Sequence, residues 1–62
     1  MNPQLWSLWS WGNEENNIWK VVHLEYDKHL SITLQNIQTH KTVKESKDRL
    51  LEFGKFIRNE SN

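Results

Sequence analysis

Residues 18–37 read IWKVVHLEYDKHLSITLQNI, and this stretch decides the fold that the sequence predicts. Two runs rich in Val, Ile, Leu and aromatic residues flank the polar break Tyr26-Asp27-Lys28-His29, a pattern typical of a β-hairpin. Residues 30–36 alternate between apolar and polar, so we expect one face of that strand to be buried. A hairpin alone is marginal in water and needs a third strand or a helix to cover one face.

The register of this hairpin depends on the length of its turn, because paired residues share a face and a shift of one residue reverses the choice. An odd-numbered turn places Val22 and Leu24 beside the apolar side of the second strand. A two-residue turn places Trp19 and Val21 there instead. The turn lacks the Asn-Gly chemistry favoured in two-residue turns, so we predict an odd turn, with Trp19, Val21 and His23 facing outward.

Residues 5–11, LWSLWSW, fit a helix about as well as a strand. Asn2-Pro3 before this segment and Gly12 after it resemble helix start and stop signals. Against a helix, Trp and Ser are middling helix formers, and residues 12–17 suit a hairpin loop. We therefore predict a strand, with a helix over residues 3–11 as the alternative.

The sequence predicts an amphipathic helix over residues 43–58. Thr42-Val43-Lys44-Glu45 matches a capping box, which satisfies free amide groups in the first turn. Gly54 lies on the apolar face of this helix and costs about 1 kcal/mol relative to alanine, so we expect it to permit the close approach of a bulky group, such as a Trp ring from the sheet. The apolar face contains Val43, Leu50, Gly54 and Ile57, flanked by Leu51 and Phe53.

Together these elements predict one α+β domain over residues 1–62. Its sheet is a three-stranded antiparallel meander with strands near residues 5–11, 18–25 and 30–36, followed by the C-terminal amphipathic helix over residues 43–58. If the first segment is helical, the order becomes α-β-β-α. The protein has 62 residues and no cysteine, so it is near the lower size limit for independent folding and has no disulfide to support it. Self-association or another protein is the expected support.

Composition and motifs restrict the classes of function. Eight basic and eight acidic residues cancel, which argues against a strongly electrostatic nucleic-acid binder. The sequence has neither a signal-peptide pattern nor a membrane-spanning run, so we expect a cytoplasmic protein with no membrane contact. No glycine-rich phosphate loop, nucleophile elbow or metal-ligand spacing is present, and we predict no enzyme, cofactor, metal site or small-molecule substrate.

Four tryptophans in so short a sequence suggest the first hypothesis. One helix covers a single face of a sheet, so some indoles are expected on the other face, where exposed Trp is typical of binding hot spots. We predict a small intracellular regulatory or inhibitory protein that binds another protein, or a second copy of itself. The predicted interface is Trp6, Trp9, Trp11, Trp19 and Val21, with an acidic rim of Glu14, Glu15 and Glu25. Alternatively, one or two of the indoles build the core beneath Gly54.

Basic residues support a second hypothesis, a nucleic-acid-binding module. Positive charges at the helix entrance and along one helix face suit an anion or a phosphate backbone. The alternative interpretation is a solvated face with pairs such as Glu45 to Arg49. A third possibility is a structural subunit that folds only within a larger assembly. The candidate phosphate-binding residues are His40, Lys41, Lys44, Lys47, Lys55 and Arg58.

Overall fold

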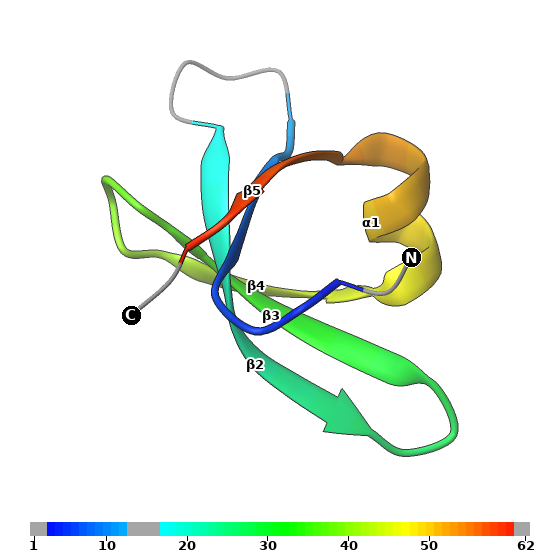
Figure 1. Cartoon of the computed structure of the whole chain (residues 1–62). Coiled ribbons are helices and arrows are strands. Elements are labelled where there is room, and N and C mark those ends of the chain that lie inside the picture. Colours follow the sequence, from blue (N-terminus) through cyan, green and yellow to red (C-terminus); the bar gives the residue numbers. More distant parts are fainter. Residues whose placement is uncertain (1–2, 13–16, 61–62) are drawn as a thin grey trace.

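The computed structural model describes residues 3–12 and 17–60. In this part of the protein, five strands form one antiparallel sheet in the order β4-β3-β2-β1-β5, and one short helix connects β4 to β5 (Figure 1). The α+β class is therefore correct in its coarse form, but the predicted three-stranded meander undercounts the strands. The elements are β1 (Ser7–Ser10), β2 (Ile18–Tyr26), β3 (Leu30–Asn36), β4 (Thr42–Ser46), α1 (Lys47–Phe53) and β5 (Lys55–Asn59).

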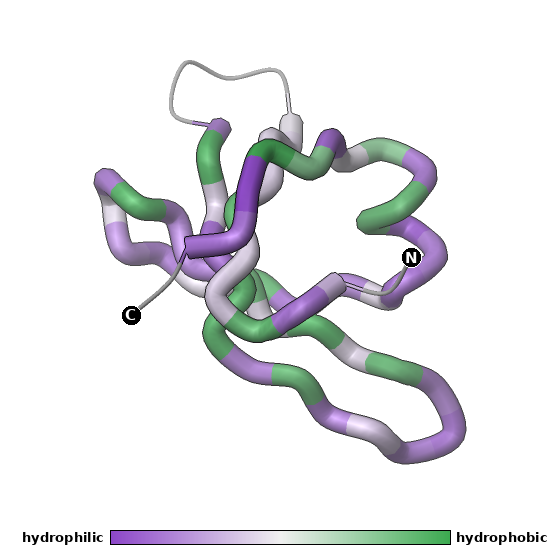
Figure 2. Tube along the Cα trace, viewed as in Figure 1, coloured by the Kyte–Doolittle hydropathy of each residue, from purple (hydrophilic) through white to green (hydrophobic). Residues whose placement is uncertain are grey.

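The β2–β3 hairpin forms where the sequence predicts it. Tyr26 pairs with Leu30, so the turn between them is the odd, three-residue turn Asp27-Lys28-His29. The Asp27 amide donates to the His29 carbonyl across this turn, at 3.3 Å. Apolar and polar residues alternate along β3 of the hairpin from Leu30 to Gln35 (Figure 2). The odd turn is confirmed.

A β-bulge in β2 changes the consequence of that turn. Val21 pairs with Leu34 whereas His23 pairs with Thr33, so Val22 is an extra residue with no partner of its own in this register. An extra residue on one strand reverses the alternation of side chains beyond it. In β2, odd-numbered residues before the bulge and even-numbered residues after it therefore face the same side of the sheet.

The bulge places members of both candidate apolar sets of β2 on the inner face, namely Leu24 from one set and Trp19 and Val21 from the other. Leu24 pairs opposite Ile32 on one side of the bulge, and Val21 lies on the same face beyond it. Val21 is fully buried, and Trp19 is partly buried against the core. The prediction that Trp19 and Val21 face outward is wrong, because it assumed unbroken alternation. His23 is exposed, as predicted.

The first segment is a strand, and the helical alternative is wrong. β1 is shorter than predicted and lies between β2 and β5, so it is a central strand of the sheet. The backbone enters it through a turn in which the Ser7 amide donates to the Gln4 carbonyl, at 3.1 Å. Trp6 has a positive φ of 70° in this turn, and its amide donates to the Val21 carbonyl, at 2.7 Å.

Residues 43–58 do not form the predicted continuous helix. Thr42–Ser46 pairs with β3, Lys55–Asn59 pairs with β1, and the helix is limited to Lys47–Phe53. Its N-cap is Ser46, whose hydroxyl accepts from the Arg49 amide at 3.3 Å, so the predicted capping box at Thr42 is also wrong. Helix propensity is a weak preference that strand pairing overrides here, because both flanking segments complete ladders of the sheet.

Gly54 ends α1 and lies close to a Trp ring. A Cβ atom at this position would lie 2.7 Å from the Leu50 carbonyl oxygen and 3.3 Å from Cε3 of Trp11. The Gly54 amide donates to the same carbonyl, at 2.8 Å. The predicted close approach of an indole from the sheet is confirmed, although Gly54 lies at the C-cap and not within the helix.

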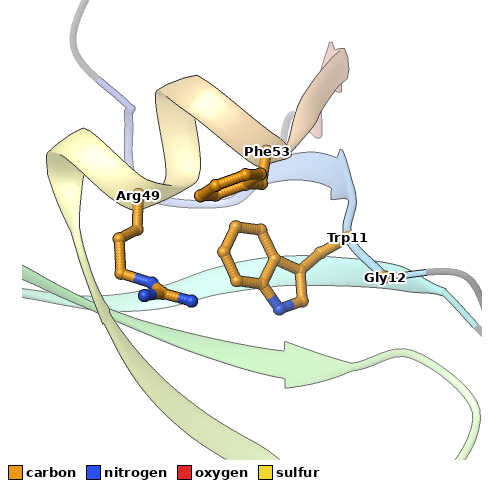
Figure 3. A pocket seen from close by; sticks show the side chains of 4 residues that line it. All are labelled: Trp11, Gly12, Arg49 and Phe53. Carbon is orange, nitrogen blue, oxygen red and sulfur yellow. The ribbon is translucent and has the colours of Figure 1, made fainter.

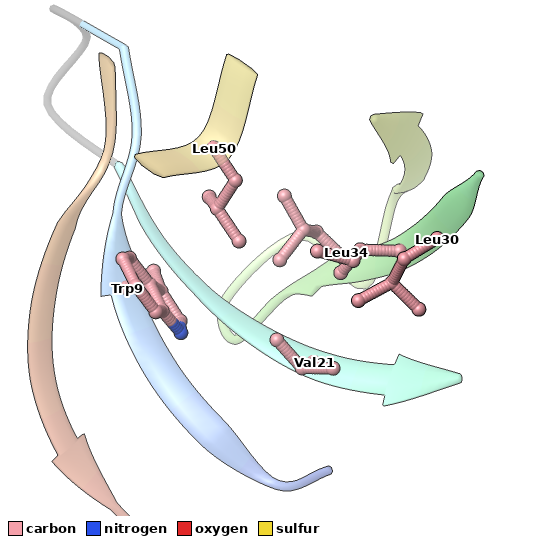
Figure 4. Close-up of a cluster of buried hydrophobic side chains, with 6 residues drawn as sticks. Trp9, Val21, Leu30, Leu34 and Leu50 are labelled. Carbon is pink, nitrogen blue, oxygen red and sulfur yellow. The ribbon is translucent and has the colours of Figure 1, made fainter. Parts of the chain in front are cut away.

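The core lies between the inner face of the sheet, defined as the face that contacts α1, and Leu50, the buried residue of α1 (Figure 4). The sheet curves around it, so that β1 and β5 run at a steep angle to β3 and β4 (Figure 1). Trp11, Trp19 and Leu24 are partly buried and pack against this cluster. The buried cluster consists of Trp9, Val21, Leu30, Ile32, Leu34 and Leu50.

Candidate binding surfaces

Two aromatic pairs involve Trp9 of β1 and Trp11, which directly follows β1. The Trp9 and Phe56 rings meet edge to face, with centroids 5.5 Å apart, and the Trp11 and Phe53 rings do so at 6.5 Å. The β1–β5 register explains the first pair, because Trp9 lies opposite Phe56. We call these four residues the aromatic strip. Trp9 is buried, whereas Phe53 is 59% exposed and Phe56 is 40% exposed.

Internal hydrogen bonds hold the tryptophans in place. The Trp9 indole donates to the Ser7 hydroxyl at 2.9 Å, and that hydroxyl donates to the Gln4 carbonyl at 2.6 Å. The Trp19 indole donates to the Trp11 carbonyl, at 3.2 Å. A buried indole N–H needs such a partner, so Trp9 and Trp19 act as fixed supports of the fold.

A pocket of about 320 Å³ opens at the Trp11 end of the aromatic strip, lined by Trp11, Gly12, Arg49 and Phe53 (Figure 3). The guanidinium carbon of Arg49 lies 5.6 Å from the Phe53 ring centroid, and its Nε lies 3.2 Å from the Glu45 carboxylate. These two contacts orient a side chain that is 62% exposed. The pocket therefore combines aromatic walls with one oriented cation.

The outer face of the sheet, opposite α1, gathers basic residues. Because paired residues share a face, the strand registers place one row of side chains across all five strands. Lys44 on one edge strand and Lys55 on the other occupy the same face, and among the described strand residues Glu25 is the acidic residue there. The row across the sheet is Arg58, Leu8, Lys20, Gln35 and Thr42.

The predicted phosphate-binding residues are divided among three places. His40 and Lys41 lie in the β3–β4 turn, where His40 has a φ of 64°, and Lys47 is the first residue of α1. Lys44 lies in β4, and Lys55 and Arg58 lie in β5. The predicted grouping at a helix entrance and along one helix face is therefore wrong, because residues 42–46 and 55–59 are strands.

Most of the predicted tryptophan interface belongs to the core or its margin. Trp9 and Val21 are buried, so a partner cannot reach them in the folded protein, while Trp11 and Trp19 are partly buried and Trp6 is more exposed. Glu14 and Glu15 of the predicted acidic rim lie outside the described residues, and Glu25 lies on the outer face.

Sequence reasoning did not identify Phe53, Phe56 or Lys20 as surface site residues. The helix assignment of Phe53 is correct, but Phe56 was assigned to the same helix although the run KFIRN after Gly54 has the aromatic and β-branched residues of a strand. Lys20 joins the outer face only through the β1–β2–β3 register. Assigning residues 55–59 to a strand would have revealed the aromatic strip.

Within residues 3–12 and 17–60, no group of three or more His, Cys, Asp or Glu residues is arranged to hold a metal ion. In the same part of the protein, no helix has the length and apolar character needed to cross a membrane. Comparisons with protein-family models, with curated proteins and with solved structures found no match for this sequence. The candidate surfaces therefore rest on the geometry alone.

Proposed function

We propose that this protein is a small protein-binding module whose contact surface is centred on the aromatic strip. The observation that carries the proposal is the exposure of Phe53 and Phe56, at 59% and 40%, beside a buried Trp and a partly buried one. Exposed aromatic side chains are typical of interaction surfaces, and they supply much of the binding energy of protein interfaces. The proposed action is binding itself, as in a regulatory or inhibitory protein.

The supports beneath these rings favour binding. Trp9 and Trp11 contact the edges of the two Phe rings, and Trp9 is held by its own buried hydrogen bond. Side chains that are already oriented lose less conformational entropy when a partner binds. Phe53 and Phe56 therefore present apolar area with a smaller ordering cost than freely rotating side chains would have.

Selection from a random-peptide display library on the immobilised protein tests this proposal without knowledge of the natural partner. The selected peptide is then titrated against Phe53→Ala and Phe56→Ala variants. Each substitution is expected to weaken binding about tenfold or more, as for an interface hot spot. Tyr26→Ala is the matched control, because Tyr26 is an exposed aromatic residue, at 72%, at the far end of the β2–β3 hairpin.

Circular dichroism of each variant confirms that the sheet is intact before affinities are compared. Equal affinities for the wild-type protein and both Phe variants would contradict the proposal, as would a loss in Tyr26→Ala that matches theirs. A selection that enriches no peptide over several rounds would also count against it.

A second candidate function is nucleic-acid binding on the outer face. The observation that favours it is the convergence of Lys20, Lys44, Lys55 and Arg58, which come from three separate segments, onto one face of the sheet. Cationic side chains gathered on one face suit the phosphate groups of a nucleic-acid backbone. The zero net charge of the protein makes this candidate second to protein binding.

A further inference from the structure

The pocket at the end of the aromatic strip holds an arginine that uses only part of its hydrogen-bonding capacity in contacts with the other described residues. The Arg49 Nε faces the Glu45 carboxylate at 3.2 Å, and the guanidinium lies over the Phe53 ring. Within residues 3–12 and 17–60, its terminal nitrogens have no hydrogen-bond partner. A guanidinium offers several N–H groups in a planar fork that matches a carboxylate, so Arg49 is oriented to accept an anion.

The walls of the pocket determine the rest of the ligand. Trp11 and Phe53 supply aromatic surface, and Gly12 contributes no side chain. The two rings are nearly perpendicular, at 82° with centroids 6.5 Å apart, so they do not form a parallel slot for a flat base. A rounded apolar side chain fits an angular pocket of this kind better than a stacked nucleobase does.

Charge also limits the ligand. A cationic ligand would meet Arg49 at the pocket, whereas an anionic ligand would pair with it. Glu45 already balances part of the arginine charge through the bond to Nε. The ligand that complements both features therefore has an apolar group next to a single negative charge.

We propose that the pocket of Trp11, Gly12, Arg49 and Phe53 binds an apolar side chain of a partner polypeptide together with an adjacent carboxylate, which pairs with Arg49. The carboxylate is that of an Asp or Glu residue or of the C-terminus of the partner polypeptide. This inference rests on the proposed protein-binding function and specifies the partner: a peptide segment that carries an apolar residue beside an acidic group. Phe53 lines both the pocket and the aromatic strip, so one partner segment can contact both.

Two small probes with the same branched apolar side chain test the carboxylate directly: N-acetyl-leucine and its neutral amide. Each is titrated into the ¹⁵N-labelled protein, and the Trp11 indole N–H resonance is followed, with the buried Trp9 indole as the internal reference. The acid is expected to shift the Trp11 resonance and to bind about threefold to fivefold more tightly than the amide, the size typical of an exposed ion pair. Arg49→Gln should remove this difference.

Matched arginine variants separate the fork geometry from the charge. Arg49→Lys keeps the charge but loses the planar fork, so it should retain part of the preference for the acid. Arg58→Gln removes an arginine from the outer face and should leave the preference unchanged. The peptides selected on the wild-type protein should carry Asp, Glu or a free C-terminus next to an apolar residue, and this enrichment should disappear on Arg49→Gln.

Several results would overturn the proposal. Equal binding of the acid and the amide would show that the carboxylate does not contribute to binding. Tighter binding of adenosine monophosphate would indicate that the ligand is a nucleotide and not a polypeptide. A Trp11 shift on simple dilution of the protein would indicate that a second copy occupies the pocket. Peptides that bind the aromatic strip without acidic enrichment would refute this inference while leaving the proposed function intact. No enrichment of any peptide, with the acid still bound at Arg49, would instead contradict the protein-binding function.

Discussion

The inner and outer faces of the sheet differ sharply at neighbouring positions of the same strands. Along β3, Leu30, Ile32 and Leu34 are buried on the inner face, while Ser31 and Thr33 alternate with them on the outer face. The inner face stabilises the fold and, at its β1–β5 end, continues into the exposed aromatic strip. The outer face holds cations and short polar side chains. Stability and the proposed protein binding therefore share one face, and the second candidate function, nucleic-acid binding, is assigned to the other.

A buried apolar residue on the outer face departs from this division. Leu8 lies on the outer face between Lys20 and Arg58, yet it is only 3% exposed. Long basic side chains can cover apolar surface with their methylene groups while their charged ends remain in water. We infer that Lys20 and Arg58 contribute packing around Leu8 as well as charge.

The largest expected effect comes from the inner face. Leu50→Ala removes the buried residue of α1 and should reduce the free energy of unfolding by about 2–5 kcal/mol, the range for such core truncations. Because natural domains are stable by about 5–15 kcal/mol, this loss should populate the unfolded state at moderate urea concentrations. Urea titration followed by Trp fluorescence measures it.

Leu51→Ala is the matched control for this substitution, since Leu51 is the next residue of α1 and is exposed. Its effect should stay within about 0.5 kcal/mol, as for ordinary surface positions. Equal losses for Leu50→Ala and Leu51→Ala would mean that α1 does not pack on the inner face as described.

The outer face contributes much less to stability than the buried side of the inner face does. A triple variant, Lys20→Gln, Lys44→Gln and Lys55→Gln, should change the free energy of unfolding by about 1 kcal/mol or less, because exposed charges contribute little.

The same variant tests the second candidate function by a fluorescence titration with duplex DNA at about 50 and 200 mM salt. If this face binds phosphate, wild-type affinity falls with salt, and the variant reduces the log-log slope by about 0.9 for each contact removed. An unchanged slope would exclude these lysines as phosphate contacts.

The parts of the fold that the sequence predicted depend on local patterns. The alternation of residues 30–36 and the missing Asn-Gly chemistry at Asp27-Lys28 were sufficient for β3 and its three-residue turn. The bulge was not predictable in this way, because Val21 and Val22 are both apolar and either can face the core. Pairing with β3 decides between them, and that pairing is not a local property.

Residues 42–59 show the same limit more strongly. A capping pattern and helical spacing are real local signals, but they compete with strand pairing to β3 and β1, which brings together residues far apart in the sequence. The aromatic strip depends on this pairing. The sequence therefore indicated the tryptophans as candidate site residues, but it did not indicate that Phe53 and Phe56 contact them. The contact between Gly54 and Trp11 was predictable, because a glycine within an apolar pattern indicates the close approach of a large group.

Chemical-shift mapping of the library-selected peptide on the ¹⁵N-labelled protein compares the two faces in one experiment. If the aromatic strip is the binding surface, the largest chemical-shift changes occur at Trp11, Phe53 and Phe56, while the amide resonances of Lys20 and Lys44 do not shift. Shifts concentrated at Lys20, Lys44 and Arg58, with the strip unchanged, would contradict the proposed function and move the binding surface to the outer face.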